Sequence, residues 1–499
     1  MLAWTIYISF LGALALMLPG VPARAARGIA LLAAIAGFAV TISQLMAPAN
    51  GAMATIVHHS WIPSLGIEYH LAADGISLLL VLLTGIVAIA GVLFSWNIEH
   101  RSKEFFALYL ALIGGVYGVF LSADVFLLFV FYEIAIIPKY FLIAIWGSTR
   151  REYAAMKLAL YSLVGSAMVL IVLIAAYVIA GAKTMNILAL SQFQFPLHFQ
   201  MWAFPLMFVG FGILAGLWPL HTWAPTGHVA APTAASMLLA GVVMKLGAYG
   251  CLRVAMTLFP RGLDPWGFRV LGLGSWQDVF SLLAVIGIVY GAMVALVQHD
   301  FKFVIGYSSV SHMGFVLLGL MTLNRIGLTG AVLQMFSHGV LAALLFAVVG
   351  RMVYDRTHTR DLAALSKMHL NKAIPFAAVT FTLAAIASVG MPGFSGFVAE
   401  LQVIVGTWSA YPIYVVVAGI GIAISVAYAW RAMQKAFFSD AGPESTMLPL
   451  PPISMPERLG AAMLILASLT VGLYPQWLLN LVIPALNSPL FEGLRKGRW

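Results

Sequence analysis

Charged side chains are scarce in this sequence. Asp, Glu, Lys and Arg make up 9% of its 499 residues, whereas apolar residues make up 62%. A soluble domain carries about a quarter charged residues. The charge is too sparse to cover a soluble surface, which excludes a soluble enzyme, a disordered protein and a disulfide scaffold. The composition predicts an all-α polytopic membrane protein.

Cysteine is also scarce. Because Cys251 is the single cysteine, this chain alone can form no disulfide and hold no iron–sulfur cluster or Cys-based zinc site. No Walker or dinucleotide-binding motif is present, and the longest loops outside the membrane, near 47–74, 253–276 and 434–458, are too short for a nucleotide-binding domain. We expect no cofactor and no metal site on this chain, and neither ATP hydrolysis nor NADH binding by it.

Long apolar runs, by contrast, are abundant. A membrane-crossing helix needs about 20 apolar residues. The run at 2–19 lacks a basic start and is followed by further runs, which indicates a retained helix rather than a signal peptide. We predict about fourteen spans, near 2–19, 28–46, 75–96, 105–122, 125–147, 154–180, 202–223, 230–252, 277–297, 302–322, 327–350, 373–408, 411–433 and 459–482.

The distribution of Lys and Arg predicts the orientation. With the N-terminus outside, most of the 26 basic residues fall on the cytoplasmic side. This assignment places Lys302 on the cytoplasmic side, and Arg253, Lys496 and Arg498 on the opposite side. Both termini are therefore predicted to be periplasmic. The net charge of +9 then reflects basic loops, and we expect no nucleic acid as a partner.

Several ionisable residues lie near the middle of predicted spans. Such groups are costly in the bilayer, so each is a functional hypothesis. Acids and bases at one depth suit a proton relay. Desolvation and neighbouring groups can bring the pKa values of Glu and Lys toward neutral, where the pKa of His already lies. A buried His is often only structural, Glu133 and Lys245 could form a structural ion pair, and Lys157 could reach the interface. The candidate pathway residues are Glu133, Lys139, Lys245, His312, His338 and Glu400.

Two predicted spans contain helix breakers at mid-depth. One is Gly216–His221, with Pro219, and the other is Gly390–Gly393, with Pro392. Broken helices at corresponding positions of two halves are typical of inverted-repeat transporters. We therefore predict two inverted five-helix repeats, spans 4–8 and 9–13, with spans 7 and 12 broken. The predicted organisation is 1–104 for spans 1–3, 105–437 for the repeat core and 438–499 for a loop and span 14.

Three motifs resemble a known family. The segments Tyr307–Phe315, Gln334–Gly339 and Ala231–Gly241, the last continuing to Lys245, are similar to the antiporter-like subunits of respiratory complex I. The resemblance extends over spans 4–13, and within the family it is strongest to subunit M. Glu400 after the broken helix fits subunit M, where subunits L and N typically carry Lys.

The resemblance implies a function and an environment. It implies a proton-translocating membrane subunit of a bacterial NADH:quinone oxidoreductase in the inner membrane. By the resemblance, FMN, iron–sulfur clusters and quinone belong to partner subunits, and antiporter-like neighbours and the lipid bilayer surround the chain. Two alternatives stay open: a subunit of a multisubunit cation/proton antiporter, or of a membrane-bound hydrogenase-type complex. A purely structural anchor does not explain several ionisable groups at one depth.

One position departs from the family. The family usually places a Lys in span 7, five residues before the Pro-Leu-His, where this chain has Leu214. Lys139 appears instead in span 5, six residues after Glu133. We hypothesise that Lys139 replaces the absent lysine. The alternative is that Lys139 extends to the membrane interface or contacts a neighbouring subunit.

Overall fold

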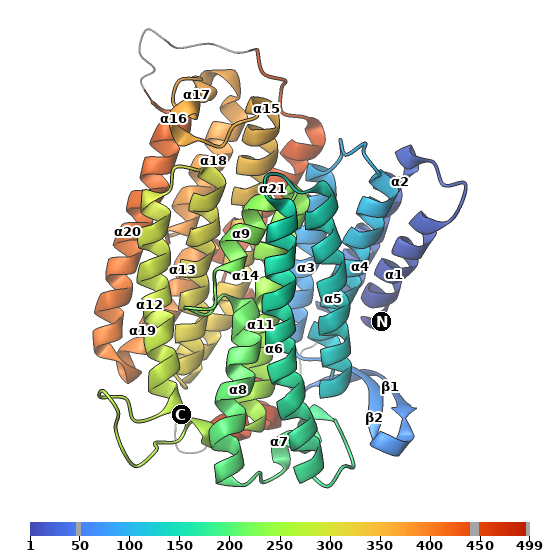
Figure 1. Cartoon of the computed structure of the whole chain (residues 1–499), viewed down its shortest axis with the longest axis vertical. Helices are drawn as coiled ribbons and strands as arrows, with labels where there is room; N and C mark the ends of the chain where they lie inside the picture. Colours follow the sequence, from blue (N-terminus) through green and yellow to red (C-terminus); the bar gives the residue numbers. More distant parts are fainter. Residues whose placement is uncertain (46–50, 440–448, 496–499) are drawn as a thin grey trace.

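The chain folds into a bundle of helices that run along one common direction (Figure 1). The computed structural model describes residues 1–45, 51–439 and 449–495. Within these residues, 12 helices are long and apolar enough to cross a membrane, and three further apolar helices are shorter. The prediction of an all-α polytopic membrane protein is confirmed.

The first five helices of the chain form one side of the bundle. They are α1 (Ala3–Met17), α2 (Ala23–Leu45), α3 (Gly75–Phe94), α4 (Ser102–Leu121) and α5 (Val125–Trp146). In Figure 1, α1 and α2 lie at the outer edge, beside α4. Helix α3 is almost completely buried and packs against helices from both ends of the sequence, which places it inside the bundle.

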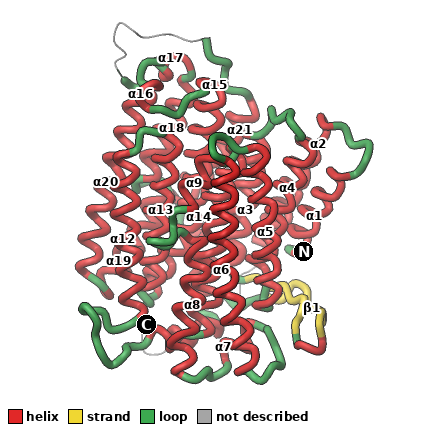
Figure 2. Tube along the Cα trace, viewed as in Figure 1, coloured by secondary structure: helices red, strands yellow, loops and turns green. Residues whose placement is uncertain are grey.

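A β-hairpin extends from the end of the bundle where α5 begins (Figure 2). Strand β1 (Ala54–Ile62) pairs antiparallel with β2 (Ile67–Ala73), and Gly66 makes the turn. The sequence prediction treated 47–74 as a loop, which was wrong for this part. The segment has few turn residues inside the strands and many β-branched and aromatic ones, a pattern that favours strands.

The two predicted helix breaks are present. Helix α8 (Leu197–Ala215) ends at Gly216, and α9 (Trp223–Ala230) follows. Helix α18 (Pro375–Ser388) ends just before Gly390, and α19 (Ser395–Ala410) follows. Both glycines have a positive φ, 84° at Gly216 and 81° at Gly390, a conformation that costs glycine little and stops a helix.

The predicted eighth span is helical but contains two π-helical segments that the sequence did not reveal. It consists of α10 (Thr233–Leu238), η2 (Leu239–Val243), α11 (Met244–Gly250) and η3 (Cys251–Met256). The whole span is buried inside the chain. Wide helical turns of this kind are frequent at functional sites.

The remaining long helices lie mostly in the second half of the chain. Arg151–Ile179 forms α6, and the second half adds α12 (Trp276–Val297), α13 (Phe301–Met321), α14 (Arg325–Ala347) with the π segment η5 (Val348–Tyr354), and α20 (Pro412–Phe437). The predicted span 459–482 was wrong in its bounds. It consists of two helices, α21 (Met455–Leu473) and α22 (Gln476–Leu486), which are separated at Pro475 because proline cannot continue the backbone hydrogen bonds.

Short elements connect the long helices: η1 (Pro63–Leu65), α7 (Ile187–Gln192), η4 (Pro260–Leu263), α15 (Asp355–Thr357), α16 (Leu362–Leu365), α17 (Leu370–Ala373), η6 (Pro489–Phe491) and α23 (Glu492–Arg495). The outer helices expose large apolar side chains, such as Ile137, Leu163 and Ile413. An apolar outer surface over buried polar groups is the distribution that a lipid environment requires.

The starts of α5 and α13 have the same local architecture. Asp124 caps α5, and Val125 donates its backbone N–H to the Met185 carbonyl just before α7. Asp300 caps α13, and Phe301 donates in the same way to Arg360 just before α16. In Figure 2, α7 and α16 lie at opposite ends of the bundle.

Candidate functional site

Lys245 is the centre of a buried polar network. It lies on α11, directly after the π segment η2, and is 0% exposed. Its Nζ donates to Nδ1 of His338 at 2.9 Å and to the backbone carbonyl of Ala240. The π segment places this carbonyl five residues before Lys245, within reach of its own side chain. The network thus begins with a fully buried amine held by one imidazole and one carbonyl.

His338 and His312 continue the network across α14 and α13. Their rings are stacked, with centroids 5.5 Å apart. His312 Nδ1 lies 3.0 Å from Oε1 of Glu400 on α19, so a proton on Nδ1 would be donated to this carboxylate. The Nε2 atoms of both histidines are buried and have no hydrogen-bond partner within the described part of the chain.

Glu400 ends this series. It is 5% exposed, and its Oε1 also accepts a hydrogen bond from Nε2 of Gln334, at 3.1 Å. A small cavity lies beside these groups; its polar lining is His312, His338, Gln334, Glu400, Ser308, Ser337 and Ser388. A polar cavity of this kind suits water, which the unpartnered Nε2 atoms could bind. The structure therefore brings together Lys245, His338, His312 and Glu400.

Glu133 and Lys139 lie on α5, apart from that series. Lys139 is 1% exposed, and its Nζ has no hydrogen-bond partner among the described residues. One carboxylate oxygen of Glu133 is also buried without a partner. The two side chains interact electrostatically, but no direct ion pair between them is found in the described part of the chain. Leu214 is buried on α8. The Lys139 side chain thus lies inside the chain rather than on its lipid-facing surface.

The sequence prediction missed His228 and Lys302. His228, at the end of α9, is 0% exposed, has no partner for either ring nitrogen among the described residues, and interacts electrostatically with Lys245 and Lys302. Lys302 was assigned to the cytoplasmic side for the orientation count, yet it is 4% exposed, and its Nζ donates to the Ala231 carbonyl at 2.6 Å. The predicted spans ended at residue 223 and began at residue 230, so His228 was treated as part of a loop.

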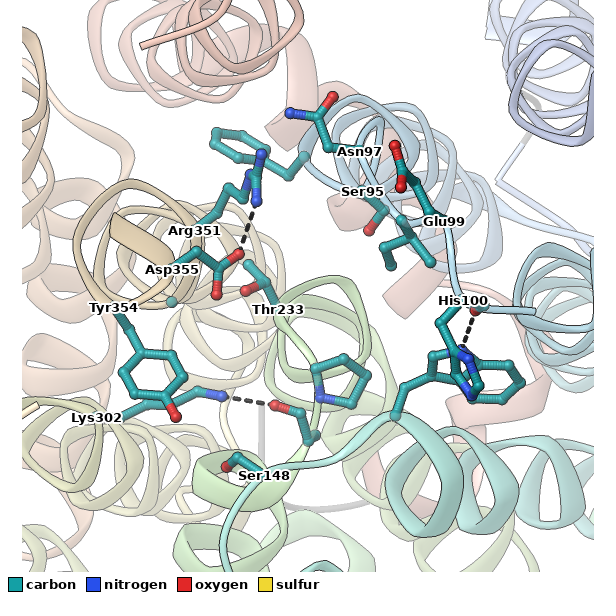
Figure 3. Close-up of a pocket in the computed structure, with 16 residues that line it drawn as sticks. Ser95, Asn97, Glu99, His100, Ser148, Thr233, Lys302, Arg351, Tyr354 and Asp355 are labelled. Atoms are coloured by element: carbon teal, nitrogen blue, oxygen red, sulfur yellow. Dashed lines mark hydrogen bonds and ion pairs between the residues drawn. The ribbon is translucent and has the colours of Figure 1, made fainter. Parts of the chain in front are cut away.

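A polar cavity opens next to Lys302. Figure 3 shows Lys302, Arg351, Tyr354 and Asp355 on one side of it, facing the α3–α4 connection. His100, Glu99, Asn97 and Ser95 from that connection, and Ser148 and Thr233, complete its polar lining. The cavity has a volume of about 300 Å³. It lies at the end of the bundle opposite the β-hairpin.

Besides the contact between His312 and Glu400, a buried ion pair between Arg253 and Asp74 lies at the hairpin end of the bundle. Arg253 donates to both carboxylate oxygens of Asp74, at 2.7 Å each, and to Tyr249. Burial by itself would raise the pKa of Asp74, but Arg253 and the Ser77 hydrogen bonds outweigh it and hold the pKa below its usual value. The orientation count placed Arg253 on the periplasmic side as if it were an ordinary basic residue, whereas in the structure it is 0% exposed and paired with Asp74. Lys496 and Arg498 lie outside the described residues.

Glu457 forms a third buried charge cluster, near the opposite end. Its oxygens lie 2.7 Å from Arg351 Nε and 2.7 Å from Arg356 Nη2, and the side chain is 1% exposed. This cluster ties α21 to η5 and α15. No sequence signal distinguished it from charges in solvated loops.

Comparison with known proteins identifies the class of this chain. Residues 122–425 match the family described as "NADH:quinone oxidoreductase/Mrp antiporter, TM". This range includes all six residues of the predicted pathway. The chain belongs to this family of antiporter-like membrane subunits.

Within the family, the chain groups with subunit M. It is 36% identical over 477 residues to NADH-quinone oxidoreductase subunit M of Rhodobacter capsulatus, covering 93% of this chain and 90% of the relative. It is 40% identical over 389 residues to NAD(P)H-quinone oxidoreductase chain 4 3 of Picosynechococcus sp., covering 76% and 68%. The predicted resemblance to the antiporter-like subunit M of complex I is confirmed.

Solved structures share the fold of this chain. A chain of respiratory complex I from Thermus thermophilus with bound NADH superposes with a TM-score of 0.88 at 26% identity, over 99% of this chain and 100% of that chain. A chain of the Mrp complex from Dietzia gives a TM-score of 0.83 at 21% identity, over 100% and 98%, which indicates a shared fold.

Proposed function

We propose that this chain is the M-type, proton-translocating membrane subunit of an NADH:quinone oxidoreductase. It moves protons through Glu133, Lys139, Lys245, His338, His312 and Glu400 and carries out no redox chemistry itself. The observation that carries the proposal is the buried series from Lys245 through His338 and His312 to Glu400. Four helices contribute to it, and each member is at most 5% exposed.

The geometry supports a stepwise relay. Lys245 donates to Nδ1 of His338, so a proton taken up there can leave from Nε2 of the same ring. His312 presents its own unpartnered Nε2 to the interior and lies with Nδ1 against Glu400. Water between the two Nε2 atoms would complete the path, and each imidazole would pass a proton from one nitrogen to the other. Glu400 is the terminal acceptor.

Uptake is proposed from the polar cavity beside Lys302. Lys302 lies at the cavity and interacts electrostatically with His228, which in turn interacts with Lys245 and His338. These groups connect the cavity with the start of the relay. The cavity lies at the end that the basic residues predict to be cytoplasmic, and both termini are proposed to be periplasmic in a bacterial inner membrane.

Glu133 and Lys139 are proposed to control the relay electrostatically. Lys139 replaces the family lysine that is absent at Leu214, and Glu133 tunes its proton affinity. Two unit charges interact by about 4 kcal/mol at about 4 Å and an effective dielectric constant near 20, and by proportionally less at the longer separation of this pair, which forms no direct ion pair in the described part of the chain. A change in the charge of either group can therefore shift the proton distribution along the chain.

The surroundings follow from the same proposal. FMN, iron–sulfur clusters and quinone are assigned to partner subunits, and antiporter-like subunits flank this chain. The core at 105–437 is proposed to consist of two inverted repeats, spans 4–8 and 9–13. The matching helix starts at Asp124 and Asp300, and the breaks at Gly216 and Gly390, support this arrangement.

An antiporter subunit is the second candidate function. The likeness to the Mrp chain and the family description favour it, and Na⁺ or K⁺ would then be the counter-ion. The greater identity to the subunit M relatives supports the oxidoreductase instead.

The decisive experiment isolates the chain with its natural partners from the native membrane. Flavin and iron–sulfur subunits should co-purify with it, and the reconstituted assembly should acidify vesicles when NADH and a quinone are added in sodium-free buffer. Antiporter subunits in place of redox subunits would contradict the proposal, as would NADH oxidation without proton movement.

A further inference from the structure

Three potential metal ligands converge on the β-hairpin, outside the membrane-spanning helices. They are His58 on β1 and Glu68 and His70 on β2. One ligand atom of each lies within 4.8 Å of the others. None of these residues belongs to the proposed proton pathway, so the cluster needs a separate account.

The hairpin register explains why these side chains meet. His58 pairs directly with His70 across the two antiparallel strands. Glu68 is two residues before His70, and alternate residues of a strand point to the same face. Directly opposite and diagonal neighbours on one face lie within reach of long side chains. All three side chains therefore gather on one face of the hairpin, while His59 points to the other.

The distances match those of metal ligands. His58 Nε2 lies 3.1 Å from Oε1 of Glu68, and His70 Nδ1 lies 3.8 Å from Oε2. Zinc binds nitrogen and carboxylate oxygen at about 2.0–2.2 Å in tetrahedral geometry, which separates two ligand atoms by about 3.3 Å. Little movement is needed to place one ion between the three side chains.

Neighbouring residues form hydrogen bonds with His70 and Glu68 and fix their orientation, as the groups around metal ligands commonly do. The Asn186 amide nitrogen can only donate to Nδ1 of His70, so the neutral ring carries its proton on Nε2, which lies 3.0 Å from Thr55 Oγ1 and can donate to it. Nδ1 now accepts from the Asn186 amide at 2.9 Å, and the same amide lies 3.3 Å from Glu68. An ion would take the place of this single amide donor.

We propose that His58, Glu68 and His70 bind a divalent transition-metal ion, with Zn²⁺ as the best fit. Zn²⁺ is commonly bound by imidazole nitrogen and carboxylate oxygen, and this site offers two imidazoles and one carboxylate. Magnesium or calcium would require more oxygen ligands. The fourth position is open to water, because the His58 side chain is 52% exposed.

The bound ion would also fix the hairpin to the helices. Asp124, which caps α5, accepts the backbone N–H of Glu68 at 3.1 Å, and Asn186 caps α7. The ligand Glu68 is therefore held between the hairpin and the starts of two helices. Metal binding would reduce opening of the hairpin from this position.

The test measures zinc binding by the intact purified assembly. After chelator treatment and removal of the chelator, equilibrium dialysis against ⁶⁵Zn²⁺ should show one saturable site that His58→Ala weakens by about tenfold or more. Glu68→Gln should weaken it as well. His59→Ala is the matched control, because it removes an exposed histidine from the opposite face and should leave binding unchanged.

A second readout is independent of other zinc sites in the assembly. Zn²⁺ should slow hydrogen–deuterium exchange in the peptide 54–73 of the wild type and of His59→Ala, but not of His58→Ala. The proposal is overturned if wild type and His58→Ala bind equal amounts of zinc. It is equally overturned if His59→Ala loses as much binding as His58→Ala, or if zinc leaves exchange in the hairpin unchanged.

Discussion

Lys245 on α11 and His338 on α14 are joined by a hydrogen bond of 2.9 Å between Nζ and Nδ1, although 93 residues separate them in the sequence. The amine is completely buried, and its one other partner among the described residues is the carbonyl of Ala240. This pair defines where a proton on Lys245 can go next, because His338 accepts from it directly.

Replacing Lys245 should stop proton movement without preventing assembly. We expect Lys245→Ala to lower proton pumping by about tenfold or more, a loss of about 1.4 kcal/mol or more in the rate-limiting barrier. Lys245→Arg should not restore pumping, because arginine keeps its proton at every relevant pH. Pumping per NADH oxidised in reconstituted vesicles measures both. Lys183→Ala, in an exposed loop, is the control. Normal pumping by assembled Lys245→Ala would exclude it from the relay.

Lys139 should be needed for proton pumping if it replaces the lysine that is absent at Leu214. Lys139→Met is expected to impair pumping, and adding Leu214→Lys to that variant should restore part of it, because the new amine enters from α8. Ile137→Met, on the lipid-facing side of α5, is the control for effects of substitution in this helix. If Lys139→Met pumps normally, the replacement hypothesis is wrong.

The ion pair between Asp74 and Arg253 should matter for stability. Asp74→Asn removes the charge opposite a fully buried guanidinium, which typically costs about 3–5 kcal/mol. The thermal midpoint of the solubilised assembly should fall. Asp74→Leu combined with Arg253→Met should lose less, because no charge is left unpaired.

The same ion pair has a predictable pH dependence. The pKa of Asp74 is lower in the folded chain than its ordinary value. Its contribution to stability is therefore complete at neutral pH and is lost as the pH falls from the ordinary range through the lowered folded pKa. A double variant with the same acid sensitivity as the wild type would argue against this role.

Close packing between α8 and α11 should depend on Gly247. A Cβ added at this position would lie 2.4 Å from the Ala215 nitrogen and 2.5 Å from the Phe211 carbonyl oxygen. Because these are backbone atoms, Gly247→Ala should push the helices apart at the α8 break and cost about 1–3 kcal/mol. Gly287→Ala, where the nearest atom is 3.6 Å away, should be tolerated. Recovery of assembled protein and its thermal midpoint compare the two variants.

The positions of the helices could be predicted well because hydropathy is a local property. The breaks at Gly216 and Gly390 were also visible, since glycine and proline act on their own backbone. The hairpin at Ala54–Ala73 was missed although its β-branched and aromatic residues favour strands, because the segment was treated only as a connection between spans. The π segments around Lys245 were missed because no residue type specifies them.

The sequence by itself determined that this chain crosses a membrane many times and carries ionisable groups at mid-depth. The scarcity of charged residues excludes a soluble fold. Because a charge inside a membrane span is costly, Glu133, Lys139, Lys245 and Glu400 could each be recognised as functional candidates from the sequence. Only the tertiary structure decided which of them meet. It placed Lys245 against His338, His312 against Glu400 and Lys302 against the Ala231 carbonyl, and it gathered His58, Glu68 and His70 on one face of the hairpin. Helix packing and strand register bring together residues far apart in the chain, and hydropathy does not encode those distances.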